Sequence, residues 1–187
     1  VTVRELGAIQ NSNSQIACAQ LEAMHMGGQR ATAAQATKIF APVAACWKLF
    51  DQLVADKVLG QAELMPFVQD ALENNKPVDA RRMAAYVFDS TDLATYDAMM
   101  REPQKWLSSQ SGARSATGNE IIALSLAVLA RKDLSAADNA LRTTWTDKLS
   151  KDKIQWVYGQ FALLVVYNLD SRANDWYRQT AGIRLSE

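Results

Sequence analysis

The sequence predicts an all-α protein, specifically an α-superhelix, or solenoid, of stacked helical hairpins with degenerate repeats. Its 187 residues include only 8 Gly and 4 Pro, and apolar residues recur at three- and four-residue steps along most segments. No Asn-Gly or Asp-Gly pair marks a β-hairpin. Pairs of predicted helices restart about every 30 to 40 residues, which is the spacing of helical repeats. The tetratricopeptide consensus is absent, so the repeats are degenerate.

Composition excludes several classes of function. Twenty basic and twenty acidic residues give a formal net charge of zero, so the chain as a whole has no electrostatic attraction to nucleic acid or an anionic membrane. The longest apolar run, 161–167, is far shorter than the roughly 20 residues of a membrane-spanning helix. No signal peptide opens the chain at 1–5. We therefore expect no nucleic-acid partner and no membrane span, in a protein that is cytosolic or is a mature or excised piece of an exported one.

The first half is predicted to begin with a lead-in segment, residues 1–13, before a single domain over 14–187. Asn11 to Ser14 has the composition of a turn whose last residue can cap a helix. Gly27 and Gly28 end the first helix, Pro42 suits the first turn of the third, and Pro66 leaves the start of the fourth open. The predicted helices of this half span 14–26, 29–41, 42–60 and 61–74.

The second half continues as helices. Ser90 to Asp92 is a capping cluster, and 135–138 resembles a capping box with Asp in the usual place of Glu. The polar stretch 108–118 is the longest predicted loop. The segment 119–132 is apolar nearly all round, so we expect it at the centre of the fold. The predicted helices begin at Pro77 and then span 93–101, 103–107, 119–132, 135–149, 150–168 and 172–180.

The two cysteines, Cys18 and Cys46, leave a disulfide and a pair of buried thiols both open on composition alone. The helix layout favours the disulfide, because each cysteine falls on the first helix of a pair and the two pairs are consecutive. In a stacked solenoid those helices are neighbours, within the Cα–Cα reach of a disulfide. Closing a loop of about 28 residues would stabilise the fold by roughly 3 kcal/mol in the chain-entropy model.

The sequence offers no acid–base, metal or cofactor site. His25 is the only histidine, and we assign it a packing or helix-end role because no second histidine stands at metal-ligand spacing and no cysteine or serine partner is indicated. Glu120, between a polar loop and an apolar helix, is the best-placed candidate for a buried carboxylic acid, but a solvated helix face is the better explanation. We therefore predict no catalytic residue, no metal and no cofactor.

The tryptophans and the paired basic residues have both a structural and a functional interpretation. Aromatic faces suit sugar C–H groups, but packing of helix against helix explains five scattered tryptophans better. Arg81-Arg82 and Arg131-Lys132 are interpreted as helix-surface charges rather than an anion site. The tryptophans are Trp47, Trp106, Trp145, Trp156 and Trp176.

Three short stretches are specific enough to compare with a known family. They are Cys18-Ala19-Gln20, then Ala45-Cys46-Trp47-Lys48-Leu49-Phe50, then the texture from Leu72 to Arg81-Arg82-Met83-Ala84. On these residues the segment 18–87 resembles the α-superhelical region of bacterial soluble lytic transglycosylases, in which one cysteine precedes an Ala-Cys-Asp-x-Leu-Phe-like helix. Here Trp47 replaces the acidic residue, and the connector between the cysteines looks shorter.

The resemblance implies that the chain is a fragment of a larger enzyme. Such enzymes have a ring-like helical superhelix, a linker and a lysozyme-like catalytic domain, and they cleave the β-1,4 bond between N-acetylmuramic acid and N-acetylglucosamine to 1,6-anhydro products. The family's Glu-Ser, Gly-Leu-Met-Gln and Ala-Tyr-Asn-Ala-Gly motifs do not occur here, so no catalytic role is carried over to any residue.

The function implied is therefore a non-catalytic scaffold. Its partners would be the catalytic domain of the parent chain and the glycan strands of peptidoglycan. Its location would be the periplasm, which agrees with the disulfide. The alternative is a stand-alone helical-repeat module that binds a peptide or protein in its concave face.

Overall fold

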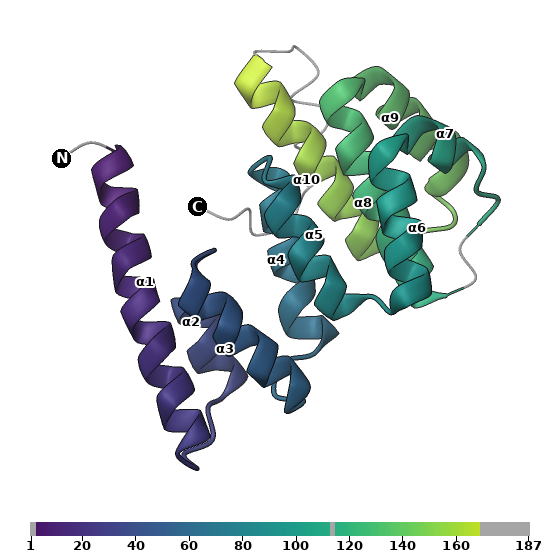
Figure 1. Ribbon diagram of the computed structural model, residues 1–187. Helices are drawn as coiled ribbons and strands as arrows, with labels where there is room; N and C mark the ends of the chain where they lie inside the picture. The colour runs from purple at the N-terminus through teal and green to yellow at the C-terminus, as the bar shows by residue number, and fades with distance from the viewer. Residues whose placement is uncertain (1–2, 113–114, 169–187) are drawn as a thin grey trace. The chain divides into compact units, whose positions relative to one another are not determined.

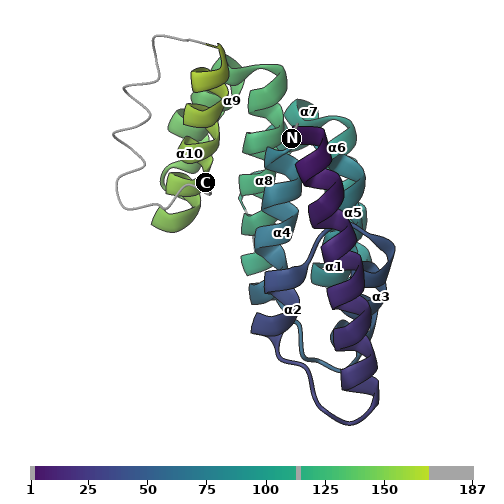
Figure 2. The same ribbon diagram turned by 90° about the vertical axis from the view of Figure 1, so that its left-hand side faces the viewer.

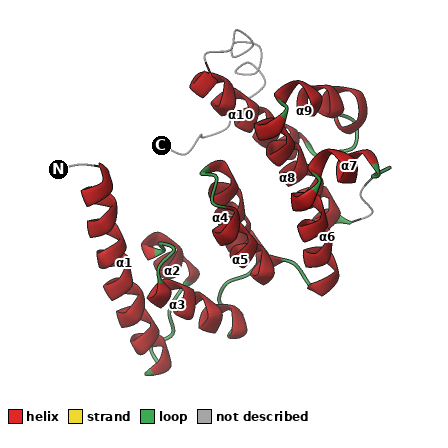
Figure 3. Cartoon of the chain, turned by 45° about the horizontal axis from the view of Figure 1, so that its top comes forward, coloured by secondary structure: helices red, strands yellow, loops and turns green. Residues whose placement is uncertain are grey.

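The computed structural model describes residues 3–112 and 115–168. These residues form ten α-helices and one π-helical turn, with no strand among them (Figure 3). The all-α prediction is therefore confirmed. The chain divides into two compact units, Val1–Val87 and Phe88–Glu187, and each is described by itself. The single domain expected over 14–187 stays a prediction.

The first unit contains five helices (Figure 1). α1 contacts both α2 and α3, while α4 pairs with α5. The structure differs from the sequence-based expectation at the start, because the first helix begins at Val3 and the stretch Asn11 to Ser14 lies inside it. Asn11, Ser12 and Asn13 are exposed there, where a polar side chain costs the helix little. The helices are α1 (Val3–Met26), α2 (Ala33–Ile39), α3 (Ala44–Ala55), α4 (Gln61–Glu73) and α5 (Pro77–Val87).

Three helices of the first unit end in the same way. α1, α3 and α4 are each followed by a residue in the left-handed conformation: Gly28 with φ 94°, Lys57 with φ 56° and Asn75 with φ 55°. The next N–H then donates to a carbonyl five residues back, which is the Schellman cap. These bonds measure 3.1 Å from Gln29 to Met24, 2.8 Å from Val58 to Leu53 and 2.7 Å from Lys76 to Ala71. Only the first of these three left-handed residues is a glycine. The glycines in the sequence therefore predicted one of the three helix ends and missed the other two.

Pro66 lies inside α4, beyond the first turn, although prolines are tolerated best at the start of a helix. The start of α4 is fixed at Gln61, because the Glu63 carboxylate accepts the N–H of Gly60 at 2.9 Å. Proline has no N–H, so the carbonyl four residues earlier receives no bond from it. The ring itself is exposed, so it disturbs no buried contact.

The second unit is built around α8, which contacts α6, α7, α9 and α10 (Figure 2). All ten residues from Ile121 to Ala130 are buried. The expectation of a central helix is therefore confirmed. The elements are α6 (Ser90–Arg101), α7 (Pro103–Ser108), α8 (Ala116–Lys132), α9 (Leu134–Ala140), the π-helical turn η1 (Leu141–Trp145) and α10 (Lys151–Asn168).

Aspartates cap two helices of this unit at positions that the sequence patterns missed. Asp89 accepts the N–H groups of Thr91 and Asp92, at 2.9 and 2.8 Å, so α6 begins before the expected Leu93. Asp133 accepts the N–H of Ala136 at 2.9 Å, so the expected capping box 135–138 lies inside α9. Aspartate at the N-cap is as favourable as serine, and at the start of both α6 and α9 an aspartate and a serine lie close together in the sequence. The predicted last helix, 172–180, falls outside the described residues.

Candidate functional site

The two cysteines serve the architecture of the first unit. Cys18 of α1 and Cys46 of α3 form a disulfide with a Cα–Cα distance of 5.0 Å, the pairing that the helix layout favoured. Both side chains are fully buried. Because a buried disulfide has no thiolate, it is not a nucleophile or a metal ligand.

His25 lies at the end of α1 and uses both ring nitrogens. Its Nδ1 accepts the N–H of Ala31 at 3.1 Å, and its Nε2 lies 2.8 Å from Asp56 Oδ2. These partners fix the neutral tautomer, with the proton on Nε2. Hydrogen bonds from Gln52 and from His25 lower the pKa of Asp56. The ring is only 8% exposed, so this is the helix-end role expected for it.

Glu120 also has a structural partner. Its Oε1 lies 2.6 Å from Lys153 Nζ, in an ion pair that joins the start of α8 to α10, and the two side chains are only 18% and 24% exposed. No group of three or more His, Cys, Asp or Glu side chains suited to a metal occurs within 3–112 and 115–168. In that same part of the chain, every helix is too short or too polar to cross a membrane.

The tryptophans within the described residues pack between helices. Trp47 is 5% exposed and Trp145 is 1% exposed, so neither presents a free ring face for a sugar. Trp106 and Trp156 pack against the core of the second unit. Trp176 lies outside the described residues. Packing thus accounts for all four tryptophans whose positions are described.

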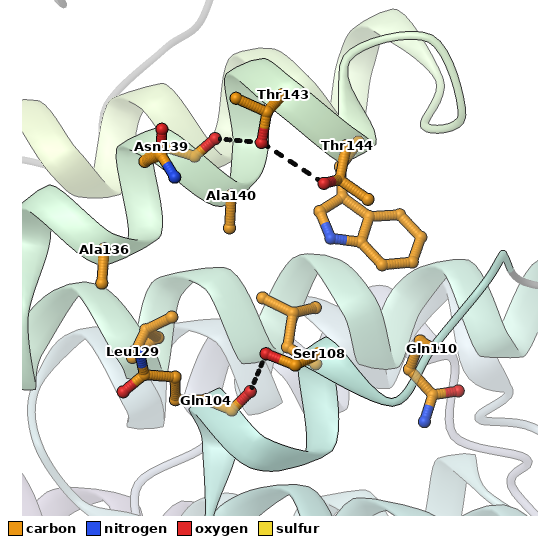
Figure 4. Close-up of a pocket in the computed structure, with 11 residues that line it drawn as sticks. Gln104, Ser108, Gln110, Leu129, Ala136, Asn139, Ala140, Thr143 and Thr144 are labelled. Atoms are coloured by element: carbon orange, nitrogen blue, oxygen red, sulfur yellow. Dashed lines mark hydrogen bonds between the residues drawn. The ribbon is translucent and has the colours of Figure 1, made fainter.

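A groove of about 370 Å³ in the second unit is a candidate binding site. It lies between α7 on one side and α9 with η1 on the other, over a floor from α8 (Figure 4). We call it the neutral groove, because no lining residue carries a charge. Its polar residues are Gln104, Ser108, Gln110, Asn139, Thr143 and Thr144, and its apolar residues include Leu107, Leu129 and Trp145.

The polar groups of the neutral groove differ in how they are used. The hydroxyls of Ser108 and Thr143 donate to the carbonyls of Gln104 and Asn139, each at 2.8 Å (Figure 4). The side-chain amides of Gln104 and Asn139, by contrast, have no partner among the described residues, and both are exposed. Each amide offers two donor hydrogens and one acceptor oxygen. The groove thus presents unused hydrogen-bonding groups on its two opposite sides.

One wall of the neutral groove is the π-helical turn. The N–H of Thr146 donates to the carbonyl of Leu141 at 2.9 Å, five residues back. Such turns insert one extra residue into a helix and are frequent at functional sites. No motif marks this turn in the sequence, and the lining comes from three separate segments. For those reasons the sequence did not indicate the groove. Its chemistry suits an uncharged ligand with both hydroxyl or amide groups and an apolar face.

The comparisons with known proteins found a similarity of structure but none of sequence. No protein-family model matches the chain, and no curated protein matches it in sequence. The X-ray structure of an inactive mutant of the lytic transglycosylase Slt from Pseudomonas aeruginosa is similar, with a TM-score of 0.66 and 20% sequence identity. The similarity is one of fold.

The match covers 90% of this chain and 29% of that transglycosylase, so the chain spans less than a third of the length of the protein it is similar to. The match is consistent with the predicted superhelix of helical hairpins. It also agrees with the resemblance found in 18–87, although at this identity it carries the fold alone.

Proposed function

We propose that this chain is a non-catalytic helical scaffold from a peptidoglycan lytic transglycosylase. The observation that carries the proposal is the fold match to Slt over 90% of the chain, together with the independent sequence resemblance around Cys18 and Cys46. Its parent would cleave the bond between N-acetylmuramic acid and N-acetylglucosamine, and the parent's catalytic domain would be the first partner. Glu120, paired with Lys153, would not act as the acid.

The location we propose is the periplasm. A disulfide persists in an oxidising compartment and is rarely maintained in the cytosol. The Cys18–Cys46 bridge is fully buried and joins α1 to α3. Export would therefore be part of the protein's normal folding.

The second partner we propose is the glycan strand, held in the neutral groove. A glycan made of N-acetylated sugars carries hydroxyl and acetamido groups and apolar C–H faces. The free amides of Gln104 and Asn139 can hydrogen-bond to the former, and the apolar side chains of Leu107 and Leu129 can contact the latter. The groove has no charge to balance, and an uncharged sugar brings none.

Purified peptidoglycan sacculi test this function. The chain is expected to sediment with sacculi and to release no 1,6-anhydro-muropeptides from them by mass spectrometry. Gln104→Lys and Asn139→Lys should each weaken sedimentation, because a lysine in the groove must be desolvated without a partner. Gln20→Lys, on the exposed face of α1, makes the same change of charge outside the groove and should bind like the wild type.

Each part of the proposal has its own contrary result. Release of anhydro-muropeptides by this chain would contradict the non-catalytic role, and Glu120→Gln would then show whether that carboxylate is responsible. If Gln104→Lys and Asn139→Lys sediment as well as the wild type, the groove is not the glycan site. Absence of sedimentation altogether would remove the glycan partner.

The second candidate function is a stand-alone protein-interaction module. An open hollow of about 490 Å³ along α1 and α2 favours it, with Leu6 and Ile9 at its edge, each 56% exposed. Contiguous exposed apolar side chains of this kind often mark protein contacts. Two results together would favour this function over the first. The chain would not sediment with sacculi, and the backbone amides of α1 would become protected from hydrogen exchange in a protein complex.

A further inference from the structure

A second pocket, in the first unit, is lined by charged and aromatic side chains, unlike the neutral groove. Its volume is about 120 Å³, and it is bounded by the loop after α2, by α3 and α4, and by the start of α5. Sites for whole drug-sized molecules start at about 300 Å³, so this one admits a single side chain or headgroup. We call it the aromatic pocket; the residues used below are Phe40, Trp47, Phe67, Asp70, Lys76 and Asp79.

Three aromatic rings form one part of its lining, with Phe40 in contact with the other two. The ring of Phe40 lies 5.1 Å from that of Trp47 and 5.0 Å from that of Phe67, in both cases edge to face. Aromatic faces attract cations as well as apolar groups. The chain itself already uses this property, because the guanidinium of Arg82 lies 4.4 Å from the Trp47 ring centroid.

Two carboxylates complete the lining, Asp70 from α4 and Asp79 from α5. Asp79 makes no hydrogen bond or ion pair among the described residues. Asp70 accepts one hydrogen bond from Asn74 at 3.1 Å. Its pKa is raised because partial burial removes water from the charged form and because the Glu73 carboxylate repels it. A positive charge between these groups would relieve both effects.

Lys76 is the one cationic residue of the lining and makes no ion pair within the described part of the chain. Its charge lowers the pKa of Asp70, although by less than burial and Glu73 raise it. Lys76 is exposed, so water screens its interaction with the carboxylates. It therefore acts as a weak internal competitor for a ligand of the same charge.

We propose that the aromatic pocket binds a primary ammonium group on an apolar stem, of the kind that a lysine-type side chain carries. The rings of Phe40 and Phe67, which are partly exposed, contact the stem and the cation, and the carboxylates of Asp70 and Asp79 accept the ammonium hydrogens. The small volume suits a compact ammonium better than a guanidinium. This inference concerns a different unit from the glycan groove, and a cationic ligand instead of an uncharged one, so either can fail without the other.

The test uses the intact chain and a defined probe, Nα-acetyl-lysine methylamide. Binding is followed by the indole N–H resonance of Trp47 in ¹H–¹⁵N NMR spectra, assigned with Trp47→Phe. The norleucine analogue of the probe has the same stem without the charge, and the arginine analogue has the same charge in a larger group. The lysine probe should shift the Trp47 resonance in a saturable way, and the norleucine probe should not.

Three variants test the electrostatic part of the proposal. Asp79→Asn should weaken binding about five-fold, the size of a partly exposed ion pair. Lys76→Gln should strengthen binding, because it removes the internal competitor. Asp147→Asn, an exposed carboxylate in the second unit, makes the same charge change as Asp79→Asn and should leave binding unchanged.

Each alternative result overturns the proposal. Equal shifts with the norleucine probe would mean that the pocket recognises only an apolar stem. A stronger response to the arginine probe would mean that the pocket prefers a guanidinium to an ammonium group. If Asp79→Asn and Lys76→Gln do not change the affinity in opposite directions, the electrostatic basis of the proposal is wrong. If the lysine probe causes no saturable shift, the pocket is not a binding site for it.

Discussion

His25 Nε2 lies 2.8 Å from Asp56 Oδ2, and this contact ties the end of α1 to the end of α3. The other ring nitrogen accepts the N–H of Ala31 at 3.1 Å. Because Ala31 is only 3% exposed, its N–H has little access to water as a substitute acceptor. One imidazole thus holds the turn after α1 to a neighbouring helix.

We expect His25→Ala to lower the free energy of unfolding by about 1–3 kcal/mol, the cost of a buried donor left without a partner. His25→Gln keeps an acceptor and a donor and should lose less. Urea unfolding followed by circular dichroism measures both. An alanine variant as stable as the wild type would mean that water replaces the ring as the acceptor for Ala31.

The same pair gives a pH dependence on the acid side. Hydrogen bonds from Gln52 and His25 lower the folded-state pKa of Asp56 below its ordinary 3.8. A depressed carboxyl pKa contributes stability that is present above the unfolded value and is lost as pH falls through the folded value. In His25→Ala this loss below pH 3.8 should be shallower, as measured by melting temperature across an acid series.

The Cys18–Cys46 disulfide closes a loop with a sequence separation of 28. In the chain-entropy model, removing it costs about 3–4 kcal/mol. We expect the Cys18→Ala/Cys46→Ala double variant to melt at a clearly lower temperature than the oxidised wild type. Reductant should leave the melting temperature of the double variant unchanged, which is the control for non-specific effects. Two titratable thiols in protein purified without reductant would contradict the bridge.

Lys57 adopts the left-handed conformation, with φ 56°, at the end of α3. This conformation costs an L-residue with a Cβ about 1–2 kcal/mol and costs glycine almost nothing. Its side chain is exposed, so Lys57→Gly should raise the free energy of unfolding by about 1 kcal/mol. Asn75→Gly, at the equivalent position after α4, should gain less, because asparagine tolerates this conformation. Equal gains, or a loss at Lys57, would show that the unfolded-state entropy of glycine outweighs the strain.

How far the sequence determined this fold can be judged from particular residues. Periodicity located the central helix correctly, because burial from Ile121 to Ala130 requires apolar residues on every side. The helix layout also favoured the pairing of Cys18 with Cys46, since consecutive helical hairpins stack. Local capping signals were less reliable. Asn11 to Ser14 looked like a turn yet continues α1, and the left-handed stops at Lys57 and Asn75 carry no glycine.

The candidate sites were harder to predict than the fold. The neutral groove combines Gln104 with Asn139, and the aromatic pocket combines Phe40 with Asp79. Neither pair is close in sequence or part of a known motif, so only the tertiary packing brings them together. Single residues that sequence reasoning did weigh, His25 and Glu120, proved to have structural partners instead.

Asp70 should respond to pH in the opposite sense from Asp56. Burial and the neighbouring Glu73 raise its folded-state pKa above 3.8. A raised carboxyl pKa means that the folded state holds the proton more tightly, so the ionised side chain costs stability once pH exceeds the folded value. Asp70→Asn should therefore raise the melting temperature slightly at pH 7, and this gain should disappear below pH 3.8. Since Asp70 is only partly buried and remains accessible to water, solvent screens the effect and it should remain small. A gain that persists at low pH would contradict this explanation, because it would not depend on the charge of the carboxylate.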